Sequence, residues 1–599
     1  MTLTQASFVA QQPKPRTVGR RYQSIAIIIF ITCVLLGGIG SRLAHLQLIE
    51  GRRNRQLADN NRIRLVPKRP ERGKLLDRKG RILVGGRLSH SVFLWPVALK
   101  QKEWPTTLNR LARILNIPEA DIQKRLERVG YKSPALVNVA RGISPAQATA
   151  LEEFGQELVG VEVDAEAVRN YPFGDLAAHA LGYTGEMDDE DLAARKRQGY
   201  RLGDVVGQMG AEAAFESRLR GEWGGQQVEV DSSGQVIQIL GAKPAKPGNN
   251  VQLTLDLEVQ RAAETALADR KGAIVALDPS NGAILAMVSR PAFDPNLFST
   301  YITDAQWQQL QSEDFPFLNR SLRTYPPAST FKIVTTTAAI ESGRYAPDTV
   351  LPTYPYLKFG GIRFWDWNRA GFGPLNFAGA LTWSSDTFFY QIARGIGPKP
   401  LIQWTRRYGF GQKTGIELAA EEVAGLVPDA AWKRKELDEA WYLGDTVNMS
   451  IGQGYLQASP LQVAVMFAAI ANGGYRVKPH LLKDDEAAKN WRDSLGLQPQ
   501  TLRTIRQGLR QVVDGGTGKS VNAPTLPPVS GKTGTAEDPP RKSHTWFGAY
   551  APTDKPEIVV LTFAENSGGG GGSVAGPMAR QVLEAYFQPE TQSNANPKP

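Results

Sequence analysis

An uncharged apolar stretch near the N-terminus limits most strongly what this chain can fold into. No charged residue lies between Arg21 and Arg42. The 20 residues Tyr22–Ser41, wound as a helix, are long enough to cross the hydrocarbon core of a bilayer. A cleaved signal peptide would have a shorter apolar core followed by small residues, whereas Arg42 and His45 follow here. We therefore predict one uncleaved transmembrane helix over 22–41, preceded by a short tail, residues 1–21.

Charge leaves the orientation of this helix and the binding partners open. Basic residues stand on both sides of it: Lys14, Arg16, Arg20 and Arg21 before, and Arg52, Arg53, Arg55, Arg62 and Arg64 after. The positive-inside rule therefore does not decide which end is cytoplasmic. A net charge of +11 suits nucleic acid, an anionic membrane surface or an anionic cell-wall polymer equally well.

The rest of the chain has the composition of protein that folds in water. Its 599 residues exceed the size at which a single core stops growing, so we expect at least two domains. The one cysteine, Cys33, lies in the apolar stretch, which excludes an intrachain disulfide and a cysteine-ligated metal cluster. The five histidines are scattered along the sequence, so neither a metal site nor a Ser-His-Asp triad is predicted.

A change of texture near residue 248 predicts the main domain boundary. The segment Ala242–Gly248 is rich in proline and lysine, and it separates a first domain, residues 42–247, from a second, residues 248–587. The second domain begins with a helical pattern over 257–268 and a hairpin of strands 272–278 and 283–289. It ends with strands 544–550 and 557–563, a helix over 577–587 and a disordered tail, residues 588–599. Strands at both ends and a helical middle favour an antiparallel sheet covered by helices, beside an all-helical subdomain.

Three short motifs in the second domain carry chemistry. Ser329 follows two prolines at the start of a helical run, and Lys332 lies three residues later on the same helix face, within reach of the hydroxyl. Serine is a weak nucleophile that needs such a base, and lysine serves only when burial or a second cation lowers its pKa. Taken alone, this pattern is also that of a capped helix with a surface lysine.

The other two motifs supply further polar groups. Ser384-Ser385-Asp386 precedes an apolar helix and by itself would be a helix cap. Lys532-Thr533-Gly534-Thr535 lies in a run of small residues, where a strand would let a ligand approach its backbone. The order S-x-x-K, S-x-[DN] and K-T-G is the signature of penicillin-binding proteins and class A β-lactamases.

With these motifs in place, the sequence closely resembles the class B penicillin-binding proteins over nearly its whole length. The resemblance extends to Arg72-Gly73 and Asp77–Gly80, to Gly207, Gly210-Ala211-Glu212 and Leu219-Arg220-Gly221, and to Asn448–Gly454. It implies an α/β (α+β) chain: a cytoplasmic tail and transmembrane helix, a mixed stem and pedestal domain of the dimerisation type, and a periplasmic transpeptidase domain. Aspartate at position 386 resembles the elongation-specific penicillin-binding protein 2 subgroup.

The resemblance also implies a role for each motif residue. Ser329 would be the acylated nucleophile, Lys332 its base and Ser384 the proton relay to the leaving amine. Lys532 would lower the pKa of Lys332 and help to hold the substrate carboxylate. The substrate-binding residues would be Asp386, Thr533, Gly534 and Thr535, with the backbone N–H groups of Ser329 and Thr535 as the oxyanion hole.

The implied reaction is the cross-linking of peptidoglycan stem peptides, with β-lactam antibiotics as inhibitors. The family's partners are a RodA-like SEDS glycosyltransferase and an MreC-like scaffold; no cofactor and no nucleic acid are implied. Some relatives have a Gly-His-Gly segment that contributes to a metal site, whereas Gly371-Phe372-Gly373 stands here, so no metal is predicted. Two alternatives stay open: a D,D-carboxypeptidase or β-lactamase-like hydrolase, and a non-catalytic β-lactam sensor.

Overall fold

The computed structural model describes residues 17–52, 63–130, 136–201, 203–230 and 236–588. The chain forms two compact units, one of residues 1–70 and 222–246 and the other of residues 71–221 and 247–599. The predicted tails fall mostly outside the described residues: 1–16 of the first tail and 589–599 of the second.

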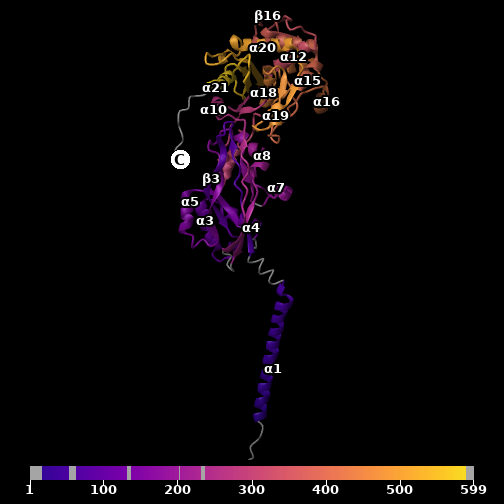
Figure 1. Ribbon diagram of the computed structural model, residues 1–599. Coiled ribbons are helices and arrows are strands. Elements are labelled where there is room, and N and C mark those ends of the chain that lie inside the picture. Colours follow the sequence, from indigo (N-terminus) through magenta and orange to yellow (C-terminus); the bar gives the residue numbers. More distant parts are fainter. Residues whose placement is uncertain (1–16, 53–62, 131–135, 202, 231–235, 589–599) are drawn as a thin grey trace, which may run out of the picture. The chain divides into compact units, whose positions relative to one another are not determined.

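The first unit contains the predicted apolar helix. Helix α1 (Thr17–Ala44) continues into a single π-helical turn, η1 (His45–Ile49), and is drawn in indigo in Figure 1. Within the apolar segment Tyr22–Ile49, an 18-residue stretch has a mean hydropathy of 2.4, and none of that stretch is buried against the rest of the described chain. Its length and composition are those of a helix that crosses a membrane.

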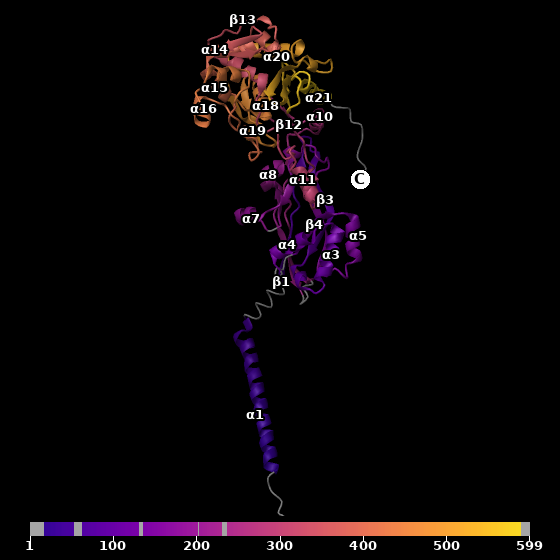
Figure 2. The same ribbon diagram turned by 180° about the vertical axis from the view of Figure 1, so that it is seen from behind.

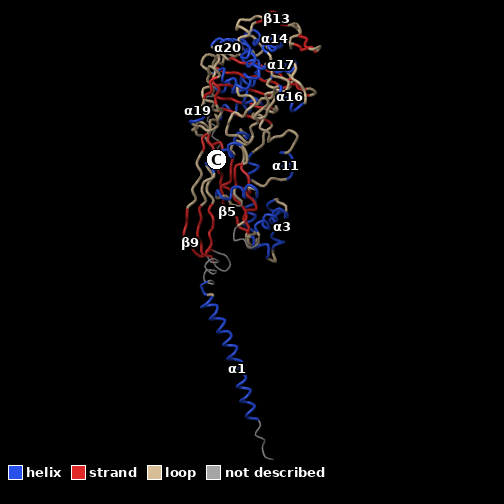
Figure 3. Tube along the Cα trace, turned by 90° about the vertical axis from the view of Figure 1, so that its right-hand side faces the viewer, coloured by secondary structure: helices blue, strands red, loops and turns tan. Residues whose placement is uncertain are grey.

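A small antiparallel sheet completes the first unit. Its strands are β1 (Ile63–Lys68), β8 (Gly224–Val230) and β9 (Val236–Lys243), in the order β1-β8-β9. Strands β1 and β8 are brought together from positions about 160 residues apart, with Lys68 opposite Gly224. Figure 3 labels β9, one of the strands of this sheet.

The N-terminal part of the second unit, residues 71–221, is called the pedestal below. Its central strand β3 (Ile82–Leu94) pairs with β2 (Leu75–Leu76), β4 (Val137–Ile143) and β5 (Val161–Asn170). Helices α3 (Trp104–Leu115), α4 (Glu119–Val129) and α5 (Pro145–Glu153) pack an apolar core against these strands. Ser144 begins α5 with a capping box, as its sequence predicts. The shorter elements are η2 (Pro96–Lys100), α6 (Ala178–Leu181), β6 (Thr184–Glu186), α7 (Asp189–Arg195), η3 (Lys196–Gln198), β7 (Val205–Gly207), α8 (Gly210–Ala214) and α9 (Glu216–Leu219).

One strand of the pedestal sheet comes from beyond the pedestal. Strand β10 (Val251–Gln252) lies parallel to β2, with Val251 opposite Leu75 and Gln252 opposite Leu76. The chain therefore returns to the edge of the pedestal sheet before it enters the C-terminal domain, residues 253–588.

The C-terminal domain is built on a five-stranded antiparallel sheet. The strand order is β12-β11-β21-β20-β19, formed by β11 (Gly272–Leu277), β12 (Ile284–Arg290), β19 (Ser530–Asp538), β20 (Arg541–Ala551) and β21 (Ile558–Ala564). The predicted hairpin at the start and the strand pair at the end are thus both present. The two strand pairs lie side by side in one sheet, because β11 pairs with β21.

Helices cover both faces of this sheet because its residues alternate between two cores. Ile274 and Val560 point into a core with α10 (Leu257–Leu267) and α21 (Ala575–Phe587), which lie next to each other in Figures 1 and 2. Val275 and Leu561 point into the other core, which contains α12 (Lys332–Glu341) and α18 (Pro460–Ala471). All the residues of α18 are buried, so this apolar helix belongs to the interior of the domain.

The middle of the domain is mostly helical. Its other helices are η4 (Pro295–Ser299), α11 (Asp304–Leu310), η5 (Ala328–Phe331), α13 (Phe377–Trp383), α14 (Asp386–Ile396), α15 (Pro398–Arg407), α16 (Ala430–Leu437), α17 (Leu443–Ser450), α19 (Glu486–Asn490), α20 (Pro499–Asp514) and η6 (Lys519–Val521). Three two-stranded ribbons, which the prediction of an all-helical subdomain did not include, interrupt them: β13 (Leu351–Thr353) with β16 (Gly373–Leu375), β14 (Tyr356–Phe359) with β15 (Ile362–Trp365), and β17 (Tyr475–Val477) with β18 (Arg492–Ser494).

Candidate active site

Ser329 lies in a tight turn at the start of a buried helix. It belongs to the 3-10 helix η5, directly before α12, and is half-buried. The preceding residue, Ala328, has a φ of 52°, and its N–H donates to Gly452 O at 2.8 Å. A Cβ on Gly452 would lie 2.1 Å from Ala328 O, so only glycine fits there. The Asn448–Gly454 segment of the sequence thus braces the turn that carries Ser329.

Ser384 lies in a second turn, between two helices. Helix α13 ends at Trp383 and α14 begins at Asp386, and Ser384 between them has a φ of 56°. The left-handed conformation costs a non-glycine residue free energy, so the surrounding contacts must hold it. Ser385 caps α14, as the sequence allowed, by accepting a hydrogen bond from the N–H of Phe388. This turn places Ser384 Oγ beside the two motif lysines.

The two lysines and the motif serine form one hydrogen-bonded chain. Lys332 Nζ donates to Ser384 O and to Asp386 Oδ1, both at 2.7 Å, and lies 3.3 Å from Ser384 Oγ. Lys532 Nζ lies 2.7 Å from the same Ser384 Oγ. Both lysine side chains are fully buried. One hydroxyl therefore joins two buried amines, and one carboxylate pairs with the first of them.

Burial perturbs the charged groups of this chain. Burial and the positive charge of Lys332 lower the pKa of Lys532 well below its usual value, although Asp386 opposes the shift. Burial also raises the pKa of Asp386, with a further contribution from Asp366 and against the effect of Lys332. The sequence predicted that Lys532 would act on Lys332; the structure adds the reciprocal effect, and the prediction for Lys332 itself stays a prediction.

The K-T-G motif lies on the edge strand β19, against the turn that carries Ser329. A Cβ on Gly534 would come within 3.0 Å of Trp546 Cβ, 3.3 Å of Thr330 Cγ2 and 3.4 Å of Ala328 Cβ. The absence of a side chain thus lets the strand approach η5. Thr533 and Thr517 share a hydrogen bond of 2.7 Å between their hydroxyls, and Thr535 is exposed. Lys332, Asp386 and Lys532 therefore gather around Ser384, and the K-T-G strand packs against the turn that carries Ser329.

The five-glycine run after β21 also has a structural place. The N–H of Gly571 donates to Thr535 Oγ1 at 3.2 Å. A Cβ on Gly571 would lie 2.5 Å from Trp546 O and 2.6 Å from Gly534 O. The structure thus packs this glycine directly against the K-T-G strand.

One carboxylate of the site was missed by the sequence analysis. Asp366 is fully buried and accepts hydrogen bonds from Ser385 Oγ at 2.8 Å and from the N–H of Thr387 at 2.9 Å. It lies between Trp365 and Trp367, outside the three motifs. An acidic residue between two tryptophans was the available signal, but nothing in the sequence connects it to a motif 18 residues later.

The two tryptophans themselves are exposed beside the site. The sequence alone does not decide whether these tryptophans line a substrate groove or belong to the core of the helical region. Trp365 is 42% exposed and Trp367 is 56% exposed, so neither is a core residue. Trp367 Nε1 donates to the carbonyl of Trp383, the residue before Ser384, at 3.0 Å. This bond fixes an aromatic surface at the rim of the site.

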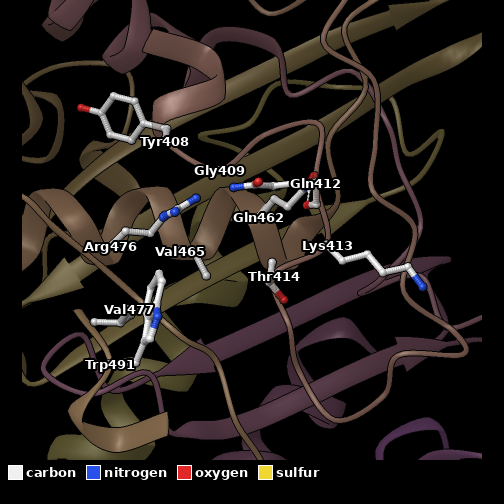
Figure 4. A pocket seen from close by; sticks show the side chains of 10 residues that line it. All are labelled: Tyr408, Gly409, Gln412, Lys413, Thr414, Gln462, Val465, Arg476, Val477 and Trp491. Carbon is white, nitrogen blue, oxygen red and sulfur yellow. Dashed lines mark hydrogen bonds between the residues drawn. The ribbon is translucent and has the colours of Figure 1, made fainter. Parts of the chain in front are cut away.

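A separate cavity of about 240 Å³ lies away from these residues. It is lined by Tyr408, Gly409, Gln412, Lys413, Thr414, Gln462, Val465, Arg476, Val477 and Trp491, shown in Figure 4. Tyr408 bonds the hydroxyl of Thr337, about two helical turns along α12 from Ser329. The cations that line this cavity already have partners: Arg476 pairs with Asp493, and Lys413 donates to Ala419 O. In Figure 4 the amine of Lys413 points away from the other side chains.

The histidines take up structural positions where they are buried. His179 Nε2 lies 2.7 Å from Pro316 O, and burial lowers the pKa of His179 to about 4. Among the residues that the structure describes, no group of three or more His, Cys, Asp or Glu side chains could hold a metal ion.

Comparisons with known proteins agree with this geometry. Residues 272–584 match the family described as penicillin binding protein transpeptidase domain, and residues 67–253 match the penicillin-binding protein dimerisation domain. The chain is 34% identical to the peptidoglycan D,D-transpeptidase MrdA of Haemophilus influenzae, over 94% of this chain and 91% of that protein.

Two solved structures share the fold over most of the chain. The complex between penicillin-binding protein 2 and MreC from Helicobacter pylori has a TM-score of 0.78 and 28% identity, covering 88% of this chain and 99% of that one. A peptidoglycan synthase complex, described as coordinating polymerization and crosslinking, contains a chain with a TM-score of 0.71 and 33% identity, covering 96% and 100%. The chain belongs to the penicillin-binding proteins with a dimerisation domain and a transpeptidase domain.

Proposed function

We propose that this protein is a peptidoglycan D,D-transpeptidase that cross-links stem peptides through an acyl-enzyme at Ser329 during cell-wall elongation. The observation that carries the proposal is the buried chain Lys332–Ser384–Lys532 behind the Ser329 turn. Such a chain offers what an acylating serine needs, namely a proton acceptor on one side and a route for the proton on the other. The relative named a D,D-transpeptidase and the resemblance of Asp386 to the elongation subgroup support the same assignment.

The acylation step begins with the loss of a proton from Ser329 Oγ. Lys332, one helical turn along, is the proposed acceptor. In the folded protein its ammonium is held by Asp386 and Ser384 O, so it needs a way to give up a proton first. The lowered pKa of Lys532 favours a neutral amine there. A proton can then pass from Lys332 through Ser384 Oγ to Lys532, which leaves Lys332 free to act as the base.

The covalent steps balance in two halves. Ser329 Oγ attacks the carbonyl carbon of the penultimate D-Ala, the C–N bond to the terminal D-Ala breaks, and Ser384 returns a proton to the leaving amine. An amine of a neighbouring stem peptide then attacks the ester, the C–O bond breaks, and Ser329 recovers its proton. The N–H groups of Ser329 and Thr535 would hold the oxyanion, and loss of one such donor costs about 2.7–4 kcal/mol.

The remaining site residues would bind the substrate. Once it has accepted the proton from Lys332, Lys532 would be an ammonium and, with the hydroxyls of Thr533 and Thr535, would hold the terminal carboxylate, because an ammonium and hydroxyl donors suit a carboxylate. Gly534 would keep the strand close to the serine turn, since a Cβ there meets Thr330 and Ala328. A β-lactam would enter as a mimic of the donor peptide and remain as an ester on Ser329.

We further propose that the N-terminal tail is cytoplasmic and the catalytic domain periplasmic, with α1 as the single-pass anchor. The domain limits of the sequence analysis, 42–247 and 248–587, are proposed as the stem and pedestal and as the transpeptidase. An MreC-like scaffold and a RodA-like glycosyltransferase are the proposed partners. The solved complex of a related protein with MreC and the related chain in a peptidoglycan synthase complex support this.

A fluorescent penicillin tests the proposal directly. The full-length protein in detergent is incubated with the label and run on a denaturing gel, beside Ser329→Ala and, as a matched control, Ser342→Ala at the end of α12. We expect a stable label on the wild type and on Ser342→Ala, and none on Ser329→Ala. Equal labelling of all three, or no label on folded wild type, would overturn the assignment.

A second assay separates the transpeptidase from the alternatives. Labelled stem peptide is supplied with and without an acceptor amine, and products are measured by mass. Cross-linked product is expected with the acceptor. Release of D-Ala without cross-linking would favour the carboxypeptidase, rapid loss of the penicillin label a β-lactamase-like hydrolase, and stable labelling with no peptide turnover a sensor.

A further inference from the structure

We propose that Asp366 is a positioning residue for acylation: it holds the turn that presents Ser384 Oγ to the two lysines. The inference rests on the proposed function and names a group that supports it from outside the three motifs. Asp366 itself touches neither Lys332 nor Ser384 and acts through the residues that follow Ser384.

The contacts of Asp366 converge on that turn. One carboxylate oxygen, Oδ2, accepts from Ser385 Oγ at 2.8 Å, from the N–H of Thr387 at 2.9 Å and from Thr387 Oγ1 at 2.9 Å. The other oxygen, Oδ1, accepts from the N–H of Asn368 at 3.2 Å. Asp366 is completely buried, as are Ser385 and Thr387. A buried carboxylate that gathers several donors is a strong anchor, because each donor would otherwise be unpaired in the interior.

The turn needs an anchor because its conformation is unfavourable. Ser384 has a φ of 56°, and it stands between the last residue of α13 and the cap of α14. Asp366 ties the start of α14 to the loop after β15, and the N–H of Asp366 is itself fixed to Pro355 O at 2.9 Å. The loop is therefore held in place independently of the turn. Ser384 Oγ must stay within hydrogen-bond distance of Lys532 and Lys332, and a displacement of about 1 Å reduces a rate about a hundredfold.

Asp366 also contributes charge to the site. Its negative charge is one cause of the raised pKa of Asp386 and, after burial and Asp386, of the raised pKa of Tyr390. The other charged groups that act on Asp386 or Tyr390 are Lys332 on α12, Glu537 on β19 and Arg369 on the same loop as Asp366. Removal of the charge at position 366 should therefore lower the pKa of Asp386, so that the carboxylate paired with Lys332 stays ionised to lower pH. The acidic limb of the acylation profile should then move to lower pH.

The test uses the full-length protein and a fluorescent penicillin under single-turnover conditions. Asp366→Asn keeps the shape of the side chain but loses the charge and turns one acceptor into a donor. We expect its acylation rate at saturating penicillin to fall about a hundredfold, with the dissociation constant of the non-covalent complex changed less than twofold. The acidic limb of its rate profile should lie at lower pH than in the wild type, a shift that loosened packing alone would not produce.

Two further variants test whether Asp366 acts through the Ser384 turn and provide a matched control. Ser385→Ala removes one donor to Asp366 and leaves the charge; its rate should fall without a shift of the acidic limb. Because both residues act through one turn, the double variant should cost less than the product of the single effects. Glu422→Gln is the matched control: this buried carboxylate also accepts from a backbone N–H and a hydroxyl, those of Thr414, but beside the separate cavity. Its acylation rate should match that of the wild type.

The outcomes separate this inference from the proposed function. If wild type acylates at Ser329 and Asp366→Asn acylates within twofold of it, the positioning role is wrong and the transpeptidase assignment stands. If Asp366→Asn and Glu422→Gln lose rate equally, Asp366 has only a general structural effect, and the inference fails. If wild type itself does not acylate, the proposed function fails first. Should Asp366→Asn not fold, the Ser385→Ala rate and profile decide in its place.

Discussion

Two buried clusters of charge, one in the pedestal and one behind Ser329, solve the same physical problem in opposite ways. In the pedestal, Glu212 is fully buried between Arg72 at 2.7 Å and Arg169 at 2.6 Å. Arg72 also pairs with Glu216 at 2.7 Å, and Arg169 donates to Gly73 O at 2.7 Å. Burial raises the pKa of Glu212, but the two guanidinium groups outweigh it and leave the pKa below its usual value.

The cluster behind Ser329 is built from lysines and shares one hydroxyl. Its two cations face a single paired carboxylate, Asp386, so the charges are not balanced as they are around Glu212. The pKa of Lys532 is lowered and that of Asp386 is raised, which means that both are driven toward their neutral forms. Arginine stays charged when buried, whereas lysine changes its protonation state readily. The comparison teaches that paired guanidinium groups stay charged and hold their neighbours in place, whereas the lysine pair can still transfer a proton.

The largest effect that follows from this difference is on acylation. Lys532→Met removes the second amine and should reduce the rate of penicillin acylation about 10,000-fold, as expected for a member of a catalytic unit. Its free energy of unfolding should not fall, because a buried amine whose pKa is lowered by burial is replaced by an apolar chain of similar length. Single-turnover labelling and urea unfolding measure the two quantities. Lost stability together with retained acylation would reverse the comparison.

The pedestal cluster should respond in the opposite sense. Glu212→Gln leaves Arg72 and Arg169 without their shared carboxylate, and breaking such a buried pair costs about 3–5 kcal/mol. We expect the free energy of unfolding to fall by this amount, measured with urea, while the folded fraction still acylates at the wild-type rate. A change below about 1 kcal/mol would mean that the cluster is less important for stability than its burial indicates.

Changing pH should sharpen the contrast. The folded-state pKa of Lys532 is below its unfolded value, so between the two the unfolded chain binds a proton that the folded chain does not. Stability from this residue therefore rises with pH, by at most about 1.4 kcal/mol per unit for one proton. The unfolding free energy of the wild type minus that of Lys532→Met should therefore become more positive from pH 7 to pH 9. A constant difference would show that Lys532 binds its proton equally in both states.

The smallest expected effect distinguishes the two kinds of cation. Arg72→Lys keeps a positive charge beside Glu212 and Glu216 but loses the planar fork that reaches both of them. We expect a loss of about 1 kcal/mol in the free energy of unfolding and no change in acylation. A loss as large as that of Glu212→Gln would indicate that the fork geometry, rather than the charge, holds the cluster together.

The sequence predicted the elements of the fold better than their arrangement. Alternation and turn residues placed strands β11, β12, β20 and β21 and helices α10 and α21 to within a few residues. Which strands are neighbours was not predictable, because pairing depends on packing between segments nearly 300 residues apart, as for β11 and β21. The pairing of β1 with β8 is a further case, since neither strand carries a signal for its partner.

The site shows the same division. Ser329, Lys332, Ser384 and Lys532 were predicted as site residues because their motifs are local and together form a known signature. Asp366 was missed because its role exists only after β15 and α14 have packed together. The effect of Lys332 on the pKa of Lys532 also depends on a geometry that the sequence does not contain. Local motifs thus indicate the candidate reacting groups, whereas the residues that contact and support these groups appear only in three dimensions.

The pairing of β10 with β2 has a consequence for the order of folding during synthesis. Leu75 and Leu76 leave the ribosome long before Val251 and Gln252, yet they form neighbouring strands of one sheet. At about 5–20 residues per second, roughly ten to forty seconds separate the two segments. The edge of the pedestal sheet at β2 therefore stays unpaired until the linker to the catalytic domain, which contains β10, has been translated.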